Sequence, residues 1–168
     1  MKKAVSGMFC AVIYSVGSMA SIAPAETLIW FDNFDRSAID SDKWTIETGD
    51  GSQYGIPGWG NQELQWYQIE NCNISGGKLN VTAKSEERNG YSYTSCRMLT
   101  RGKFSVKYGK IEARIKLPGG QGIWPAFWML PEHNIYGTWA ASGEIDIMEA
   151  VNLSPGAETG AVHGTIHY

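Results

Sequence analysis

The stretch Gly143-Glu-Ile-Asp-Ile-Met-Glu-Ala150 decides how the rest of this chain is interpreted. It places three carboxylates within six residues, among apolar side chains. Successive side chains of a β-strand point to opposite faces, so Glu144 and Asp146 share a face and Glu149 points away from it. One extra residue in a β-bulge near Ile147-Met148 would return Glu149 to the acid face. The sequence therefore predicts a bulged strand if all three acids act together.

Hydrolysis of a glycosidic bond needs two carboxyl groups with different roles, one that donates a proton and one that attacks or steers water. Retention of configuration requires the two groups to be about 5–5.5 Å apart. Along a bulged strand Glu144 and Glu149 are separated by roughly 13 Å, which two side chains leaning together can largely close. Asp146 would hydrogen-bond to Glu144 and help keep the two pKa values apart. The alternative is an edge strand with solvent-facing acids, and the apolar neighbours and preceding tryptophans disfavour it.

The surrounding sequence predicts an all-β fold. Apolar and polar side chains alternate over residues 79–84 and 111–117, as in half-buried strands, and no stretch has sustained helical periodicity. Glycine-rich turns separate the segments, which favours a two-sheet sandwich. The other expected strands are residues 27–31, 43–47, 63–68, 92–99, 103–108, 123–130, 144–152 and 160–168.

Four further motifs accompany the acidic strand. They are Trp59-Gly-Asn-Gln-Glu-Leu-Gln65, Lys110-Ile-Glu-Ala-Arg-Ile-Lys116, Trp124-Pro-Ala-Phe-Trp-Met-Leu130 and His163-Gly-Thr-Ile-His-Tyr168. Together with Glu144-Ile-Asp-Ile-Met-Glu149 they resemble glycoside hydrolase family 16, in the bulged form of its laminarinase-like members, the endo-1,3-β-glucanases. The resemblance covers nearly everything from Leu28 to the last residue. It implies a concanavalin-like β-jelly-roll sandwich with a sugar-binding groove across its concave sheet.

The same resemblance implies the catalytic roles. Glu144 would be the nucleophile of a retaining reaction, Glu149 would be the general acid and base, and Asp146 would position Glu144. The expected protein is a secreted endo-β-glucanase acting on β-1,3-linked, laminarin-like glucan. The alternatives are the same fold acting on mixed-linkage β-glucan or on a galactan such as agarose, and a non-catalytic glucan-recognition module. Such modules typically lack one of the acids, whereas both glutamates are present here.

Candidate substrate-binding residues lie on both sides of the acids. Trp124 and Trp128 are four residues apart, hence on one strand face, where they either stack on sugar rings or fill a core. Because Phe127 and Met129 supply the opposite face, we expect at least one of the two tryptophans in the groove. Trp139 resembles the family tryptophan beside the nucleophile.

The last motif adds histidines to the same region. His163, Thr165 and His167 share a strand face, and they would border the carboxylates if their strand pairs with the acidic strand. We expect Thr165 and His167 to hydrogen-bond substrate or to orient an acid, not to bind metal. Asn61 and Arg97 match family positions in the groove, although a turn residue and a surface ion pair are the simpler interpretations.

The N-terminus predicts export. Met1-Lys2-Lys3 precedes an apolar run and Ala23-Pro24-Ala25, as in a signal peptide over residues 1–25, so we expect a secreted protein, extracellular or periplasmic. Removal of the two lysines leaves 12 basic against 17 acidic residues, a formal charge of −5. This acidic balance argues against nucleic acid and membrane partners after cleavage and suits a neutral polysaccharide. We expect a monomer.

The sequence gives weaker indications about a disulfide and about metal binding. Cys72 and Cys96 remain after signal cleavage, and a disulfide or two buried thiols are equally consistent with the sequence. No cofactor is required by this interpretation, and the absence of a histidine or third cysteine at metal spacing argues against zinc. Asn33 replaces a glutamate that relatives commonly have near a structural calcium, so calcium is possible but unsupported. The chain stops at Tyr168, where family domains continue, so residues 26–168 are expected to be the N-terminal and central part of a catalytic domain.

Overall fold

The computed structural model describes residues 11–15, 26–154 and 161–168 and divides into two compact units, Met1–Lys116 and Leu117–Tyr168. Within these described ranges the secondary structure is β-strand and short 3₁₀-helix, with no α-helix, so the predicted all-β class is confirmed. The 3₁₀-helices are η1 (Ser52–Tyr54), η2 (Pro57–Gly60) and η3 (Ile69–Asn71).

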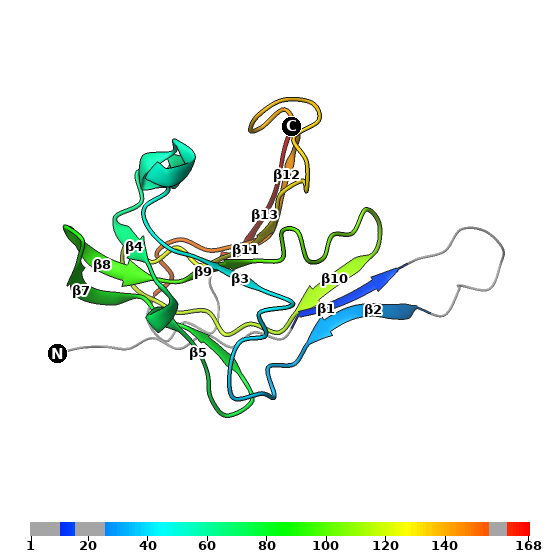
Figure 1. Ribbon diagram of the computed structural model, residues 1–168, viewed down its shortest axis with the longest axis horizontal. Coiled ribbons are helices and arrows are strands. Elements are labelled where there is room, and N and C mark those ends of the chain that lie inside the picture. Colours follow the sequence, from blue (N-terminus) through cyan, green and yellow to red (C-terminus); the bar gives the residue numbers. More distant parts are fainter. Residues whose placement is uncertain (1–10, 16–25, 155–160) are drawn as a thin grey trace. The chain divides into compact units, whose positions relative to one another are not determined.

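The first unit contains four small sheets (Figure 1). Their strand orders are β10-β1-β2, β3-β9, β4-β8-β7 and β5-β6, and within them only β4 and β8 pair in parallel. The strands are β1 (Ala11–Ser15), β2 (Thr27–Asp32), β3 (Thr45–Glu47), β4 (Gln65–Tyr67), β5 (Cys72–Ile74), β6 (Leu79–Val81), β7 (Lys84–Arg88), β8 (Tyr91–Ser95), β9 (Arg97–Leu99) and β10 (Lys110–Ala113).

Among the packed groups in the described part of this unit are an aromatic cluster and a buried amide. Trp30 stacks on Phe104 and meets Trp44 edge-on, both with ring centroids 5.4 Å apart. Asn71 is fully buried, and its amide donates to Thr82 O at 2.7 Å and Thr94 Oγ1 at 2.9 Å. A buried amide without partners would be destabilising, and these bonds supply its partners. They also join η3 to Thr82, just after β6, and to Thr94 on β8.

A disulfide joins Cys72 at the start of β5 to Cys96 between β8 and β9, with their Cα atoms 5.6 Å apart. The sequence left this pairing open. Both cysteines are buried, and the bond closes a loop of 24 residues in sequence separation. It therefore restricts the unfolded chain as well as joining two parts of the unit.

Some predicted strands differ from the structure. The segment 103–108 is not a strand, because Lys103 N and Phe104 N both donate to Thr100 O and close a turn around Gly102, whose φ is +72°. The predicted strand 92–99 is interrupted at Cys96 and forms β8 and β9. Strands β5 and β7 were not predicted, because β5 is very short and four of the five residues of β7 are charged.

Residues 1–25, predicted as a signal peptide, lie outside the described residues except for Ala11–Ser15. These five residues form β1, between β2 and β10. The described residues contain no helix long and apolar enough to cross a membrane.

The second unit is built on one antiparallel sheet of strand order β11-β12-β13 (Figure 1). The strands are β11 (Ala126–Met129), β12 (Glu144–Glu149) and β13 (His163–His167). Gly143 has a φ of +86°, and its amide donates to Ala140 O at 2.7 Å, which turns the chain into β12. The acidic strand is thus central, with a neighbour on each side.

Candidate active site

A bulge in β12 brings the three acids to one face. Asp146 lies opposite Trp128 and Thr165, and Glu149 lies opposite Ala126 and His163. Between Asp146 and Glu149 the chain advances three residues on β12 but only two on each neighbouring strand. The register therefore shifts around Ile147, and Glu149 returns to the face of Glu144 and Asp146. This is the bulge that a three-acid face requires.

Glu144 begins β12 and is held from two sides. Trp139 Nε1 donates to Glu144 Oε2 at 2.8 Å, and Oε1 lies 4.0 Å from His167 Nε2. Burial raises the pKa of Glu144, and the charge of Asp146 raises it further. The hydrogen bond from Trp139 and the neighbouring His167 act in the opposite direction. The carboxyl group is therefore set between groups that favour its neutral form and groups that favour its ionised form.

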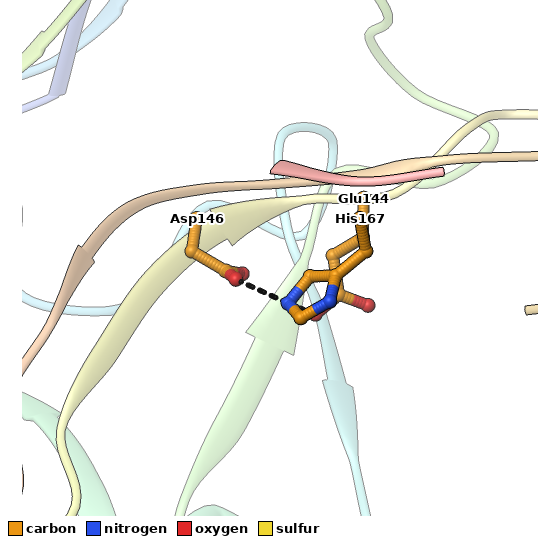
Figure 2. A group of neighbouring side chains, drawn as sticks. All are labelled: Glu144, Asp146 and His167. Carbon is orange, nitrogen blue, oxygen red and sulfur yellow. Dashed lines mark hydrogen bonds and ion pairs between the residues drawn. The ribbon is translucent and has the colours of Figure 1, made fainter. Parts of the chain in front are cut away.

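Asp146 is the most buried of the three acids, with 3% of the residue exposed. Its Oδ2 lies 3.0 Å from His167 Nε2, an interaction that Figure 2 shows from Asp146 on β12 to the imidazole on β13. The same imidazole stands beside the carboxyl group of Glu144 (Figure 2). Because β13 places His167 opposite Glu144 in register, one histidine contacts both acids.

Glu149 ends β12 and has a different set of neighbours. Its Oε1 accepts a hydrogen bond of 3.0 Å from Trp124 Nε1. Trp124 lies just before β11 and is 49% exposed, so its ring is open to solvent while its N–H is directed at the acid. The two glutamates thus each bind a different tryptophan, and Asp146 lies between them in sequence.

The other predicted residues of this region also lie on the acid face. Trp128 on β11 and Thr165 on β13 flank Asp146, and both are partly exposed. His163 was not among the predicted site residues, although on β13 it lies opposite Glu149 of β12. The alternation that selected Thr165 and His167 includes His163 as well, so the signal was present in the sequence.

Asn61 and Arg97 belong to the first unit and are not part of this sheet. Asn61 Nδ2 donates to Glu63 Oε1 at 3.3 Å, just after η2. Arg97 Nε pairs with Glu47 Oε2 at 2.7 Å, and its guanidinium lies 4.3 Å from the ring centroid of Trp59. Their described contacts are those of a turn residue and of an ion pair packed on an aromatic ring.

The segment around Asn33, for which the sequence left a structural calcium open, is linked by hydrogen bonds. Asp32 Oδ1 accepts from Phe34 N at 3.0 Å and Oδ2 accepts from Trp44 Nε1 at 2.9 Å. Asn33 Nδ2 donates to Asp35 Oδ2 at 3.0 Å. Calcium takes six to eight oxygen ligands. The described contacts of Asp32 and Asn33 are hydrogen bonds, and no role for calcium is derived from this segment.

Comparison with known proteins identifies the family. A family profile described as "XgeA-like, catalytic GH16 domain" matches residues 60–167. The beta-glucanase of Rhodothermus marinus is 47% identical over 151 residues, which are 86% of this chain and 49% of that protein. Glucan endo-1,3-beta-glucosidase A1 of Niallia circulans is 45% identical over 147 residues, covering 81% of this chain and 22% of that protein.

A solved structure agrees with these matches. The endo-beta-1,3-glucanase from Pyrococcus furiosus aligns with a TM-score of 0.72 and 42% identity, over 83% of this chain and 54% of that one. The likeness confirms the predicted jelly-roll class of fold. The chain spans about half the length of the Rhodothermus and Pyrococcus proteins and less of the Niallia protein. By sequence and by fold, this chain belongs to glycoside hydrolase family 16.

Proposed function

We propose that the protein is a secreted, retaining endo-β-glucanase that hydrolyses β-1,3-linked glucan. The observation that carries this proposal is the bulge in β12, which places Glu144, Asp146 and Glu149 on one face. A regular strand would have turned Glu149 away and left only two acids together. Two glutamates on one face with different neighbours are what a double-displacement hydrolysis requires.

In the first step Glu149 gives its proton to the glycosidic oxygen, and the Glu144 carboxylate attacks the anomeric carbon. The bond to the leaving sugar breaks as the glycosyl ester to Glu144 forms. In the second step Glu149, now ionised, takes a proton from water, and the water oxygen displaces Glu144 from the sugar. Configuration is retained because the anomeric carbon is inverted twice.

The neighbours of each glutamate suit these roles. Glu144 must attack as a carboxylate, and Trp139 donates to one oxygen of that ionised form. Asp146, whose Oδ2 lies 3.0 Å from His167 Nε2, would position Glu144, and its charge raises the pKa of Glu144, an effect that the hydrogen bond from Trp139 opposes. Trp124 Nε1 donates a hydrogen bond to Oε1 of Glu149 and so orients that carboxyl group. Its exposed ring, together with that of Trp139, which is 66% exposed, offers faces on which sugar rings can stack.

The names of the relatives support the substrate class. A beta-glucanase and two endo-1,3-β-glucan hydrolases are among the proteins that this chain resembles. We therefore propose laminarin-like β-1,3-glucan as the substrate. Mixed-linkage β-glucan and galactan remain the alternatives within the enzyme class, and a glucan-recognition module is the alternative outside it. Export rests on the signal-like residues 1–25, and N-terminal sequencing of the secreted protein would test cleavage after Ala25.

Reducing-sugar release from laminarin by the full-length natural protein tests the proposal. The matched variants are Glu144→Gln and Glu149→Gln, with Glu70→Gln as the control, because Glu70 is exposed and lies in η3 of the first unit. Both site variants should lose more than about a hundredfold in rate, the scale of general acid–base catalysis, while the control keeps its activity. Normal rates in Glu149→Gln would contradict the acid–base role. Binding of laminarin without release by the unaltered protein would favour the recognition module.

A further inference from the structure

We propose that Glu144, Asp146 and His167 form a binding site for a divalent transition-metal ion such as Zn²⁺, and that the bound ion inhibits the enzyme. The ion would be an inhibitor, not a cofactor, because it occupies the proposed nucleophile. The inhibitory effect rests on the proposed function, whereas the binding site itself does not. No metal site was expected from sequence spacing, since the three residues come together only through the pairing of β12 with β13.

The geometry of the three side chains suits a small ion. One ligand atom from each residue lies within 4.8 Å of the other two. His167 Nε2 is 3.0 Å from Asp146 Oδ2 and 4.0 Å from Glu144 Oε1. Zinc bonds of about 2.0–2.2 Å to nitrogen and oxygen in a tetrahedron place neighbouring ligands about 3.3–3.6 Å apart. These two separations lie on either side of that value, and the third, between the two carboxylates, is within 4.8 Å, so side-chain rotations can bring all three atoms to one ion.

The two oxygens of Glu144 are divided between different neighbours. Oε2 accepts the hydrogen bond from Trp139, while Oε1 is directed toward His167 at a distance beyond hydrogen bonding (Figure 2). An ion at Oε1 would therefore leave the bond to Trp139 in place. The second carboxylate, that of Asp146, is buried, with only 2% of its side chain exposed, whereas 35% of the His167 side chain is exposed. The ion would have protein ligands on one side and an open position toward solvent on the other.

The ligand set selects the class of metal. One imidazole nitrogen with two carboxylate oxygens is the kind of three-ligand set that binds zinc with an open fourth position. Calcium requires six to eight oxygens, and magnesium requires octahedral geometry with mostly water and phosphate ligands. Two adjacent carboxylates also supply negative charge that attracts a dication. We therefore expect zinc, cobalt, nickel or copper to bind, and calcium and magnesium not to bind here.

Binding should depend on pH. A metal held at Nε2 needs that nitrogen without its proton, and both carboxylates ionised. Because protons compete with the ion for its ligand atoms, the affinity should fall as the pH falls. The groups facing His167 from the sheet and its preceding loop are Glu144, Asp146 and the ring of Trp139.

Direct titration of the full-length protein with ZnCl₂ tests the site, by calorimetry and with CoCl₂ by visible absorption. We expect one equivalent to bind, more weakly at pH 5.5 than at pH 7.5, with MgCl₂ giving no heat. His167→Gln should weaken binding by more than about tenfold. His163→Gln is the matched control, since His163 lies on the same face of β13 but opposite Glu149. It should leave the zinc affinity unchanged.

A second measurement uses the unaltered protein and therefore does not depend on whether the variant folds. In the unaltered protein with ¹⁵N-labelled histidine, zinc should shift the ring signals of His167 at the same midpoint as the heat. Zinc binding that survives His167→Gln, an unshifted His167 ring, or equal binding of magnesium would overturn the proposal. Laminarin hydrolysis is measured separately, and its inhibition should share the binding midpoint. A protein that binds zinc but hydrolyses nothing would refute the glucanase proposal and leave the metal site standing.

Discussion

Replacing Trp139 by phenylalanine removes the indole N–H that donates to Glu144 Oε2 at 2.8 Å, while an aromatic ring stays in place. That hydrogen bond lowers the pKa of Glu144 against the larger effects of burial and of Asp146, which raise it. The variant should therefore have a Glu144 pKa higher than that of the unaltered protein. Because a nucleophile must be ionised, the acidic limb of the pH–rate profile should move to higher pH.

The size of the effect follows from the bond and its exposure. A hydrogen bond to a charged group contributes about 1.5–3 kcal/mol in stability series. Trp139 is 66% exposed, so water replaces much of the lost bond, and about 1 kcal/mol is a fair estimate. At 1.36 kcal/mol per tenfold, this corresponds to about a fivefold smaller ratio of ionised to neutral Glu144 at a given acidic pH.

The assay is kcat/KM for laminarin against pH, because its acidic limb reports ionisations of the free enzyme. Tyr136→Phe is the matched control, as Tyr136 is an exposed aromatic residue of the same loop. Loss of sugar stacking would lower the plateau without moving the limb, so the two effects separate. An acidic limb that stays in place in Trp139→Phe, or moves to lower pH, would refute the reasoning.

Two further predictions concern the charge beside the nucleophile and the disulfide. Asp146→Asn removes a negative charge that raises the pKa of Glu144, so the acidic limb should move to lower pH, opposite to Trp139→Phe; a shift in the same direction would count against this electrostatic account. Replacing Cys72 and Cys96 together by serine should lower the free energy of unfolding by about 3.5 kcal/mol, from the entropy of a loop with 24 residues of separation. Urea denaturation checks this, and a loss below about 1 kcal/mol would mean that the unfolded chain is already restricted there.

Much of the acid face could be predicted from the alternation of side-chain direction along the strands. Glu144 and Asp146 lie two residues apart, and the displaced position of Glu149 required an extra residue near Ile147, where the register shift occurs. The face of Thr165 and His167 follows from the same alternation. These predictions succeed because side-chain direction in a strand depends only on local geometry.

Contacts between segments distant in sequence could not be predicted in the same way. The sequence left Cys72 and Cys96 equally consistent with separate thiols, because their proximity depends on how β5 and β8 meet in the folded unit. Trp124 was expected to share a strand face with Trp128, yet β11 begins only at Ala126, so Trp124 is free to direct its N–H at Glu149. Alternation also failed where a backbone turn around Gly102 replaced the expected strand.

The proposed roles of Glu144 and Glu149 are tested most directly by trapping the glycosyl ester. A 2-deoxy-2-fluoro laminaribiosyl fluoride carries its own good leaving group and slows the second displacement, so the covalent intermediate should accumulate. Proteolysis and mass spectrometry of the labelled full-length protein should locate a single sugar adduct on Glu144. An adduct on Glu149, or laminarin hydrolysis with inverted product and no adduct, would contradict the assignment.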